Sequence, residues 1–269
     1  MNTTGIMNTS YIMYMLTTIM RTLTVIISDF DVYNYSLFLV VSYLIYCSYP
    51  PFKYILSKND KFRSYDENKQ YYIIKNLIKT FAMMIIFVFF IIAFVPNIIN
   101  NIWKDSHNRI IGAFYVGNDL AGLFAVPNLP KSTKFHHYTS VSLYTIICIL
   151  STEHEDNIAK LIVIYTVFSC IPYLVNNYLA LRFFYNRDKT LSLRDKNVNR
   201  VLDFNRLSAY YIYLICCICN WIYHVQFLVT KVLANNFTIS YLIYYMMLMP
   251  IVNDDIILLK WLKYNRLEM

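Results

Sequence analysis

The sequence predicts an all-α, polytopic membrane protein, a bundle of about seven transmembrane helices with no substantial soluble domain. The first observation is composition: of the 269 residues, 58% are hydrophobic and only 15% are charged, against roughly 25% charged in a typical soluble domain. Mean hydropathy is +0.41. A soluble fold of this size has no interior large enough for so much apolar surface, so lipid must cover part of it.

The second observation is the spacing of long apolar runs, because a membrane-spanning helix needs about 20 mostly apolar residues. Seven runs qualify as spans: 35–49, 77–99, 110–126, 138–150, 159–184, 207–232 and 238–259. The first and fourth are short, so we expect their helices to extend into flanking polar residues. The stretch 6–27 is also apolar, but it contains Arg21 and many hydroxyl residues. It suits a spanning helix and an interfacial amphipathic helix equally well.

These runs divide the chain into three parts. Residues 1–34 form an N-terminal segment with a possible extra or interfacial helix, and residues 35–69 form the first span and a basic loop. Residues 70–265 form the main membrane domain, with six of the predicted spans.

The third observation is that the connections alternate in charge. Segments 49–76, 127–135 and 185–206 and the C-terminal tail are basic. The intervening segments 100–108, 151–158 and 233–237 are neutral or acidic. By the positive-inside rule the basic set faces the cytosol, and so does the C-terminus. The net charge of +8 is distributed over these separate loops, so we expect no nucleic-acid partner.

The cysteines and the N-glycosylation tripeptides say little about function. The six cysteines all lie inside apolar runs and lack zinc-ligand spacing, which predicts buried thiols and no metal site. Asn34 and Asn236 begin N-glycosylation tripeptides on the non-cytosolic side, but both lie very close to a membrane boundary.

Polar residues at membrane depth are the candidates for function, because burying them in hydrocarbon is costly. They are Asp119 in the third span, His136, His137 and Ser140 in the fourth, Asn176 in the fifth, Asn220 and His224 in the sixth, and Asp254 and Asp255 in the seventh. Most fall in the predicted cytosolic half of the bundle. We therefore expect many of them to meet in one polar cavity that opens toward the cytosol.

The histidine pair opens the fourth span. Adjacent helical residues point about 100° apart, so only one ring of His136 and His137 can address a given small target. His136 and Ser140 share a helix face. A histidine positioned by hydroxyl groups can take a proton from an amine or alcohol that attacks a thioester. The alternative is two interfacial histidines at a helix start.

Two neighbouring segments combine an aspartate with a histidine pair. Gly112-Ala113-Phe114-Tyr115-Val116-Gly117-Asn118-Asp119, followed by Lys134-Phe135-His136-His137-Tyr138-Thr139, resembles the central aspartate and His-His pattern of the TLC domain of membrane proteins. Ser169-Cys170-Ile171-Pro172-Tyr173-Leu174 with Asn176 resembles a second family element. The resemblance covers about residues 70–265.

The resemblance implies at least six transmembrane helices around a central cavity, in the endoplasmic reticulum or a related internal membrane. It implies membrane lipids as partners, no cofactor, and a role in lipid composition or sphingolipid homeostasis. In the ceramide synthases of this family the His-His pair belongs to the active site. His136, His137 and Asp119 would then be catalytic.

An acyltransferase would use acyl-CoA as co-substrate, with Lys131 and Lys134 holding its phosphates. Ser140, Asn176, Asp254 and Asp255 are further substrate-binding candidates. The synthase pattern has carboxylates in the next helix, and the stretch around Phe168 and Pro172 lacks them. This departure favours a lipid-binding or lipid-regulating protein over a lipid N-acyltransferase. A transporter or channel lined by Asp119, Asp254 and Asp255 is a third hypothesis.

The charge pattern predicts that cysteines placed at Asn68 and Arg194 react with an impermeant thiol reagent from the cytosolic side only. A cysteine at Glu153 is expected to react only from the opposite side. Cytosolic labelling at position 153 would contradict the predicted orientation.

Overall fold

The computed structural model describes residues 30–95, 102–149, 158–184 and 193–264, together with Thr17 and Asn100. Over these residues the chain is helical and has no strand. The elements are α2 (Val32–Leu56), α3 (Asp60–Arg63), α4 (Glu67–Phe89) continued by the π-helical η1 (Phe90–Phe94), α6 (Asp105–Ala125), α7 (Lys131–Ile147), α8 (Ile158–Cys170), α9 (Tyr173–Leu181) with the 3₁₀ turn η2 (Arg182–Phe184), α10 (Leu193–Leu233) and α11 (Ile239–Tyr264).

The predicted all-α polytopic bundle is confirmed, and each predicted apolar run falls on a helical segment. By length and composition, α2, α4, α10 and α11 each suffice to cross a membrane, and the bent pair α8–α9 is a possible fifth span. The helices α6 and α7 occupy the third and fourth predicted spans but do not meet that criterion by themselves. The stretch 6–27 apart from Thr17, residues 151–157 of the predicted acidic segment 151–158, and residues 185–192 of the predicted basic segment 185–206 lie outside the described residues.

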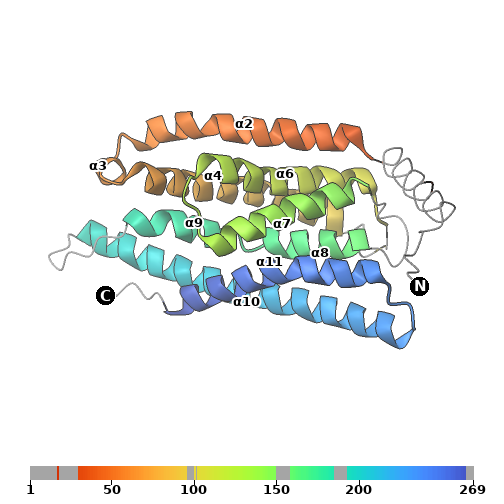
Figure 1. The fold of residues 1–269 in the computed structure, drawn as a ribbon. Coiled ribbons are helices and arrows are strands. Elements are labelled where there is room, and N and C mark those ends of the chain that lie inside the picture. The colour runs from red at the N-terminus through yellow and green to blue at the C-terminus, as the bar shows by residue number, and fades with distance from the viewer. Residues whose placement is uncertain are drawn as a thin grey trace, which may run out of the picture.

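The contacts between six segments form a closed ring. The helix α2 lies along the outside of the bundle, against α6 and α4 (Figure 1). Around the ring, α4 contacts α6, α6 contacts α7, α7 contacts α11, α11 contacts α10, α10 contacts α9, and α9 contacts α4. The most extensive contact of all is between α2 and α6. The ring encloses the interior in which the candidate site lies.

The ring contains a helix break that faces this interior. Between α8 and α9 the axis turns by 44°, and Pro172 is the residue that precedes α9. Proline has no backbone N–H and its ring clashes with the preceding helical turn, so a break here is expected. The prolines within α2 and α11 are accommodated inside continuous helices.

The outer surface is strongly apolar, as expected of a protein surrounded by lipid. Ile85 is 68% exposed and Phe124 is 72% exposed, and many other large hydrophobic side chains face outward on α2, α4, α10 and α11. Charged side chains such as Lys75, Lys79 and Asp119 are buried instead. This arrangement reverses the usual distribution of a soluble protein and suits a bilayer.

The connections predicted to be basic gather at one end of the bundle. Figure 1 shows α3, the α6–α7 connection and the end of α11 at one end, and the start of α2 and the α10–α11 connection at the other. Two side-chain contacts hold the first end together. The Asn68 Oδ1 atom accepts a hydrogen bond from the Asn128 backbone at 2.9 Å, and the Tyr65 hydroxyl donates to the Phe183 carbonyl.

A polar cluster around Arg109 ties α2, α6 and α7 together at the opposite end. Arg109 Nη1 lies 2.5 Å from Asp31 Oδ2, and its Nε donates to the Ile147 carbonyl at 3.2 Å. Partial burial raises the pKa of the Asp31 carboxyl, but hydrogen bonds from Asn34 and Arg109 outweigh this effect. The pKa therefore lies below its ordinary value of 3.8.

Because the folded-state pKa of Asp31 is lowered, its stabilisation is present above the ordinary carboxyl pKa and is lost as pH falls through the lowered value. We expect Asp31→Asn to destabilise the protein at neutral pH by about 1–3 kcal/mol, typical of a lost charge-assisted hydrogen bond. The difference from wild type should shrink below pH 4. Thermal unfolding in detergent between pH 3 and pH 7.5 measures it, and an equal deficit at both ends would contradict this account.

Candidate functional site

A cavity of about 260 Å³ lies inside the ring. Every ring segment contributes to its wall, from α4 and α6 through α7, the α8–α9 break, α10 and α11. Its polar and charged lining residues are Tyr72, Lys75, Asn76, Lys79, Tyr115, Ser132, Thr133, His136, His137, Ser169, Asn176, Arg182, Tyr213, Asp254 and Asp255. Pro130, which is exposed, also lies on the wall. The cavity therefore reaches the surface at the end of the bundle where α6 joins α7.

Asp119 lies at the centre of the charge network beside this cavity. Its side chain is fully buried, and its Oδ1 accepts a hydrogen bond from Lys79 Nζ at 2.5 Å. His137 Nδ1 lies 3.0 Å from the same oxygen. This position agrees with the expectation that the polar residues at membrane depth face the bundle interior. The main cation partner of Asp119, Lys79, was not expected.

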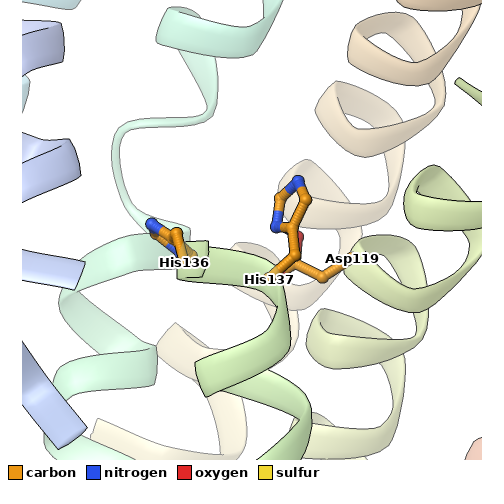
Figure 2. Close-up of side chains that lie close together, drawn as sticks. All are labelled: Asp119, His136 and His137. Atoms are coloured by element: carbon orange, nitrogen blue, oxygen red, sulfur yellow. The ribbon is translucent and has the colours of Figure 1, made fainter. Parts of the chain in front are cut away.

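His137 is buried and points into the interior beside Asp119 (Figure 2). The 3.0 Å separation is a hydrogen-bond distance, yet neither ring nitrogen of His137 has a well-directed hydrogen-bond partner in the described part of the chain. The Asp119 Oδ2 atom is similarly without one there. Buried polar atoms in this state are unusual, and they leave hydrogen-bonding capacity unused beside the cavity.

His136 faces a different carboxylate. Figure 2 shows the two imidazole rings leaving α7 in different directions, as adjacent helical positions require. The His136 Nδ1 atom lies 3.2 Å from Asp254 Oδ2, on α11, and Thr133 donates a longer hydrogen bond to the other oxygen of Asp254 at 3.4 Å. Each histidine of the pair thus has its own carboxylate, supplied by a different helix.

Asp255 is held by two tyrosines. Tyr213 donates a hydrogen bond to its Oδ1 at 2.5 Å, and Tyr165 donates to its Oδ2. The residue is buried at the cavity wall, where α8, α10 and α11 meet. Its two oxygens are engaged in tying these helices together.

Of the remaining predicted site residues, Asn176 lies on the cavity wall, whereas Ser140, Lys131 and Lys134 do not. Asn176 lines the cavity, and its amide lies 3.7 Å from the Met83 sulfur. Ser140 donates to the His136 carbonyl at 3.0 Å, so its hydroxyl does not orient the imidazole. Lys131 and Lys134 are outside the cavity wall; Lys131 is exposed, and Lys134 Nζ lies 3.4 Å from the Pro127 carbonyl.

Three cations of the wall were not recognised from the sequence: Lys75, Lys79 and Arg182. A periodic signal marks two of them, because Tyr72, Lys75, Asn76, Lys79 and Met83 follow the spacing of one helix face. The predicted apolar run begins at residue 77, so Lys75 falls in the predicted basic segment 49–76. No comparable pattern marks Arg182.

Two other polar residues singled out from the sequence, His224 and Asn34, form hydrogen bonds that stabilise the fold. His224 Nδ1 donates to the Asn220 carbonyl at 2.8 Å, and its Nε2 accepts from the Tyr244 hydroxyl at 2.9 Å. This ring joins α10 to α11. Asn34 is buried and its amide donates to Asp31 at 2.6 Å, which makes it unsuited to glycosylation. Asn236 is exposed in the α10–α11 connection.

Asp119, His136 and His137 have potential metal-ligand atoms that all lie within 4.8 Å of one another. A divalent ion bound there would compete with the Lys79 ammonium for the Asp119 carboxylate. The arrangement therefore suits hydrogen bonding and proton transfer better than metal binding.

No family model, no curated protein and no solved structure matches the chain. The chemistry of the site therefore has to be argued from its own residues. A cavity with two histidine–carboxylate contacts and buried cations can bind a polar or anionic group, and its histidines can accept a proton from that group.

We predict that Asp119→Leu destabilises the protein by about 3–5 kcal/mol, because it leaves the Lys79 ammonium buried without its carboxylate. Lys79→Met should have a similar effect for the converse reason. The double variant is expected to recover most of the loss, since apolar replacement of both partners is often neutral. Additive losses in thermal unfolding of the four proteins would show that the two residues are not coupled.

Proposed function

We propose that this chain is a TLC-like membrane protein that binds a membrane lipid, with the polar headgroup of the lipid in the ring cavity. The observation that carries the proposal is a polar, charged cavity enclosed by a bundle whose outer surface is apolar. An amphiphile matches both environments at once. Its headgroup would contact the wall residues, and its chains would lie against apolar helix faces.

The size of the cavity sets a limit on what it holds. At about 260 Å³ it is at the small end of ligand pockets, which typically measure roughly 300–1,000 Å³. Such a volume accommodates a headgroup and leaves no room for two acyl chains. The proposal therefore places the lipid chains outside the cavity. By the positive-inside rule the cavity mouth faces the cytosol, and an internal membrane such as the endoplasmic reticulum is the proposed location.

A lipid N-acyltransferase is the second candidate, and the His136–Asp254 contact favours it. A histidine next to a carboxylate is a suitable general base. The base would remove the proton of a lipid amine as its nitrogen attacks the thioester carbonyl of acyl-CoA. The C–N bond then forms, the C–S bond breaks, and the proton passes to the leaving thiolate. The carboxylate comes from α11, whereas the family pattern places it in the helix after the histidines.

The lipid-binding proposal predicts photocrosslinking inside the ring. A photoreactive phospholipid with a diazirine near its headgroup should label peptides of α4 and α9, and unlabelled lipid should compete. Asn176→Trp, which fills the cavity, is expected to abolish this labelling. The control Ile85→Trp, on the outer surface of α4, should leave it intact. Equal labelling in both variants would place the bound lipid outside the ring.

The enzymatic candidate predicts product formation from acyl-CoA and a sphingoid base in nanodiscs. His136→Ala should lower turnover by about 10²–10⁴-fold, the usual contribution of a general base. Ser142→Ala is the control, because Ser142 lies exposed on the same helix and bonds only the Tyr138 carbonyl. Absence of product from the wild-type protein, with lipid crosslinking retained, would remove the enzymatic candidate and leave lipid binding.

A further inference from the structure

Lys75 carries a buried charge that no carboxylate in the described part of the chain neutralises directly. It is only 5% exposed and lines the cavity, and no ion pair to it is found among the described residues. The nearest buried carboxylate, Asp119, pairs with Lys79. The Lys75 side chain runs along Gly122 of α6, where a Cβ would come within 3.1 Å of the Lys75 Cε. Because Gly122 has no side chain, the Lys75 side chain can pass close to α6 and reach the cavity.

Arg182 is the second cation of the wall, at the end of α9. Its guanidinium lies over the Trp261 ring, with Cζ 4.2 Å from the ring centroid, and its buried Nε has no hydrogen-bond partner among the described residues. Stacking on an aromatic face holds the planar guanidinium in place. Its N–H groups are then pre-organised for an anion, which guanidinium binds with two parallel hydrogen bonds.

The two cations lie around the same tyrosine. Lys75 Nζ is 6.0 Å and Arg182 Cζ is 5.9 Å from the centroid of the Tyr72 ring. The two cationic groups are therefore at most about 12 Å apart by these two distances. Neutral donors complete this part of the wall, among them Ser132 and Asn176.

The other charged residues at the cavity have direct contacts of their own. Lys79 pairs with Asp119, His136 contacts Asp254, and Asp255 accepts bonds from two tyrosines. Lys75 and Arg182 are the wall cations for which no ion pair is found among the described residues. Buried charges without a partner are costly, and an entering group with one to two negative charges would offset that cost. A phosphate monoester has this charge at neutral pH.

We propose that Lys75 and Arg182 form a receptor for the phosphorylated headgroup of an anionic lipid. This inference rests on the proposed lipid-binding function and names the chemical class of the headgroup. Phosphate is bound by paired lysine and arginine donors through charge-assisted hydrogen bonds. Both residues line the same cavity as His136, His137 and Asp254.

The test uses the full-length protein in a neutral detergent, with thermal unfolding as the readout. Dioctanoyl phosphatidic acid should raise the unfolding temperature at much lower concentration than dioctanoyl glycerol or inorganic phosphate. K75Q and R182Q should each weaken the apparent affinity for phosphatidic acid by roughly tenfold or more, the effect of losing a charge-assisted contact. K58Q, which changes an exposed lysine outside the cavity, should leave the affinity unchanged.

A second readout separates ligand binding from a structural role. Without ligand, K75Q should unfold at the same or a higher temperature than wild type, because it removes an uncompensated buried charge. A lower unfolding temperature without ligand, combined with unchanged affinity for phosphatidic acid, would overturn the inference.

Comparing the three ligands in this experiment also distinguishes the phosphate receptor from the proposed lipid-binding function. Equal stabilisation by phosphatidic acid and dioctanoyl glycerol would refute the phosphate receptor and support lipid binding alone. Stabilisation by inorganic phosphate as strong as that by phosphatidic acid would identify a soluble anion as the ligand and contradict the lipid assignment. Stabilisation by none of the three would refute both proposals.

Discussion

A carboxylate buried in the centre of a membrane bundle must be compensated, and this structure is organised around the compensation of Asp119. The Lys79 ammonium and the His137 ring converge on one of its oxygens, at 2.5 Å and 3.0 Å. These three residues come from α4, α6 and α7, so the charge contact fixes three adjacent members of the ring. It also determines which cations remain free to act. Because Lys79 neutralises Asp119, the charge of Lys75 is available for a ligand.

The fold could be predicted largely from hydropathy. The described part of each apolar run is mostly helical, with one run broken at Pro172, and the described parts of the basic connections lie at one end. What hydropathy does not contain is which helices are neighbours. The ring order, in which α4 lies between α6 and α9 and α11 lies beside α7, depends on packing between segments distant in sequence. The start of α4 also differed from the prediction. The helix begins at Glu67, ten residues before the predicted apolar run, and includes the buried Lys75. The polar composition of these first turns suggested a loop, although they are helical.

The candidate site was predictable in its residue types but not in its pairings. The polar residues of five helices were expected to meet in one cavity, and His136, His137, Asn176, Asp254 and Asp255 do line it. The pairing of His136 with Asp254 could not be foreseen, because these positions are brought together only when the last helix packs on α7. Lys131 and Lys134 flank the histidines in sequence but do not line the cavity, while Lys75 and Arg182 reach it from α4 and the end of α9.

The central claim is that a lipid-embedded ring encloses a polar, water-accessible cavity. Reactivity of single cysteines on α4 toward an impermeant, hydrophilic thiol reagent tests it most directly, in a background without the six native cysteines. Tyr72 is partly exposed and lines the cavity, whereas Ile85 is 68% exposed on the outer face. Thiolates form in water and not in hydrocarbon, so Tyr72→Cys should react in membranes and Ile85→Cys should not. Rapid reaction at position 85 with none at position 72 would contradict the account.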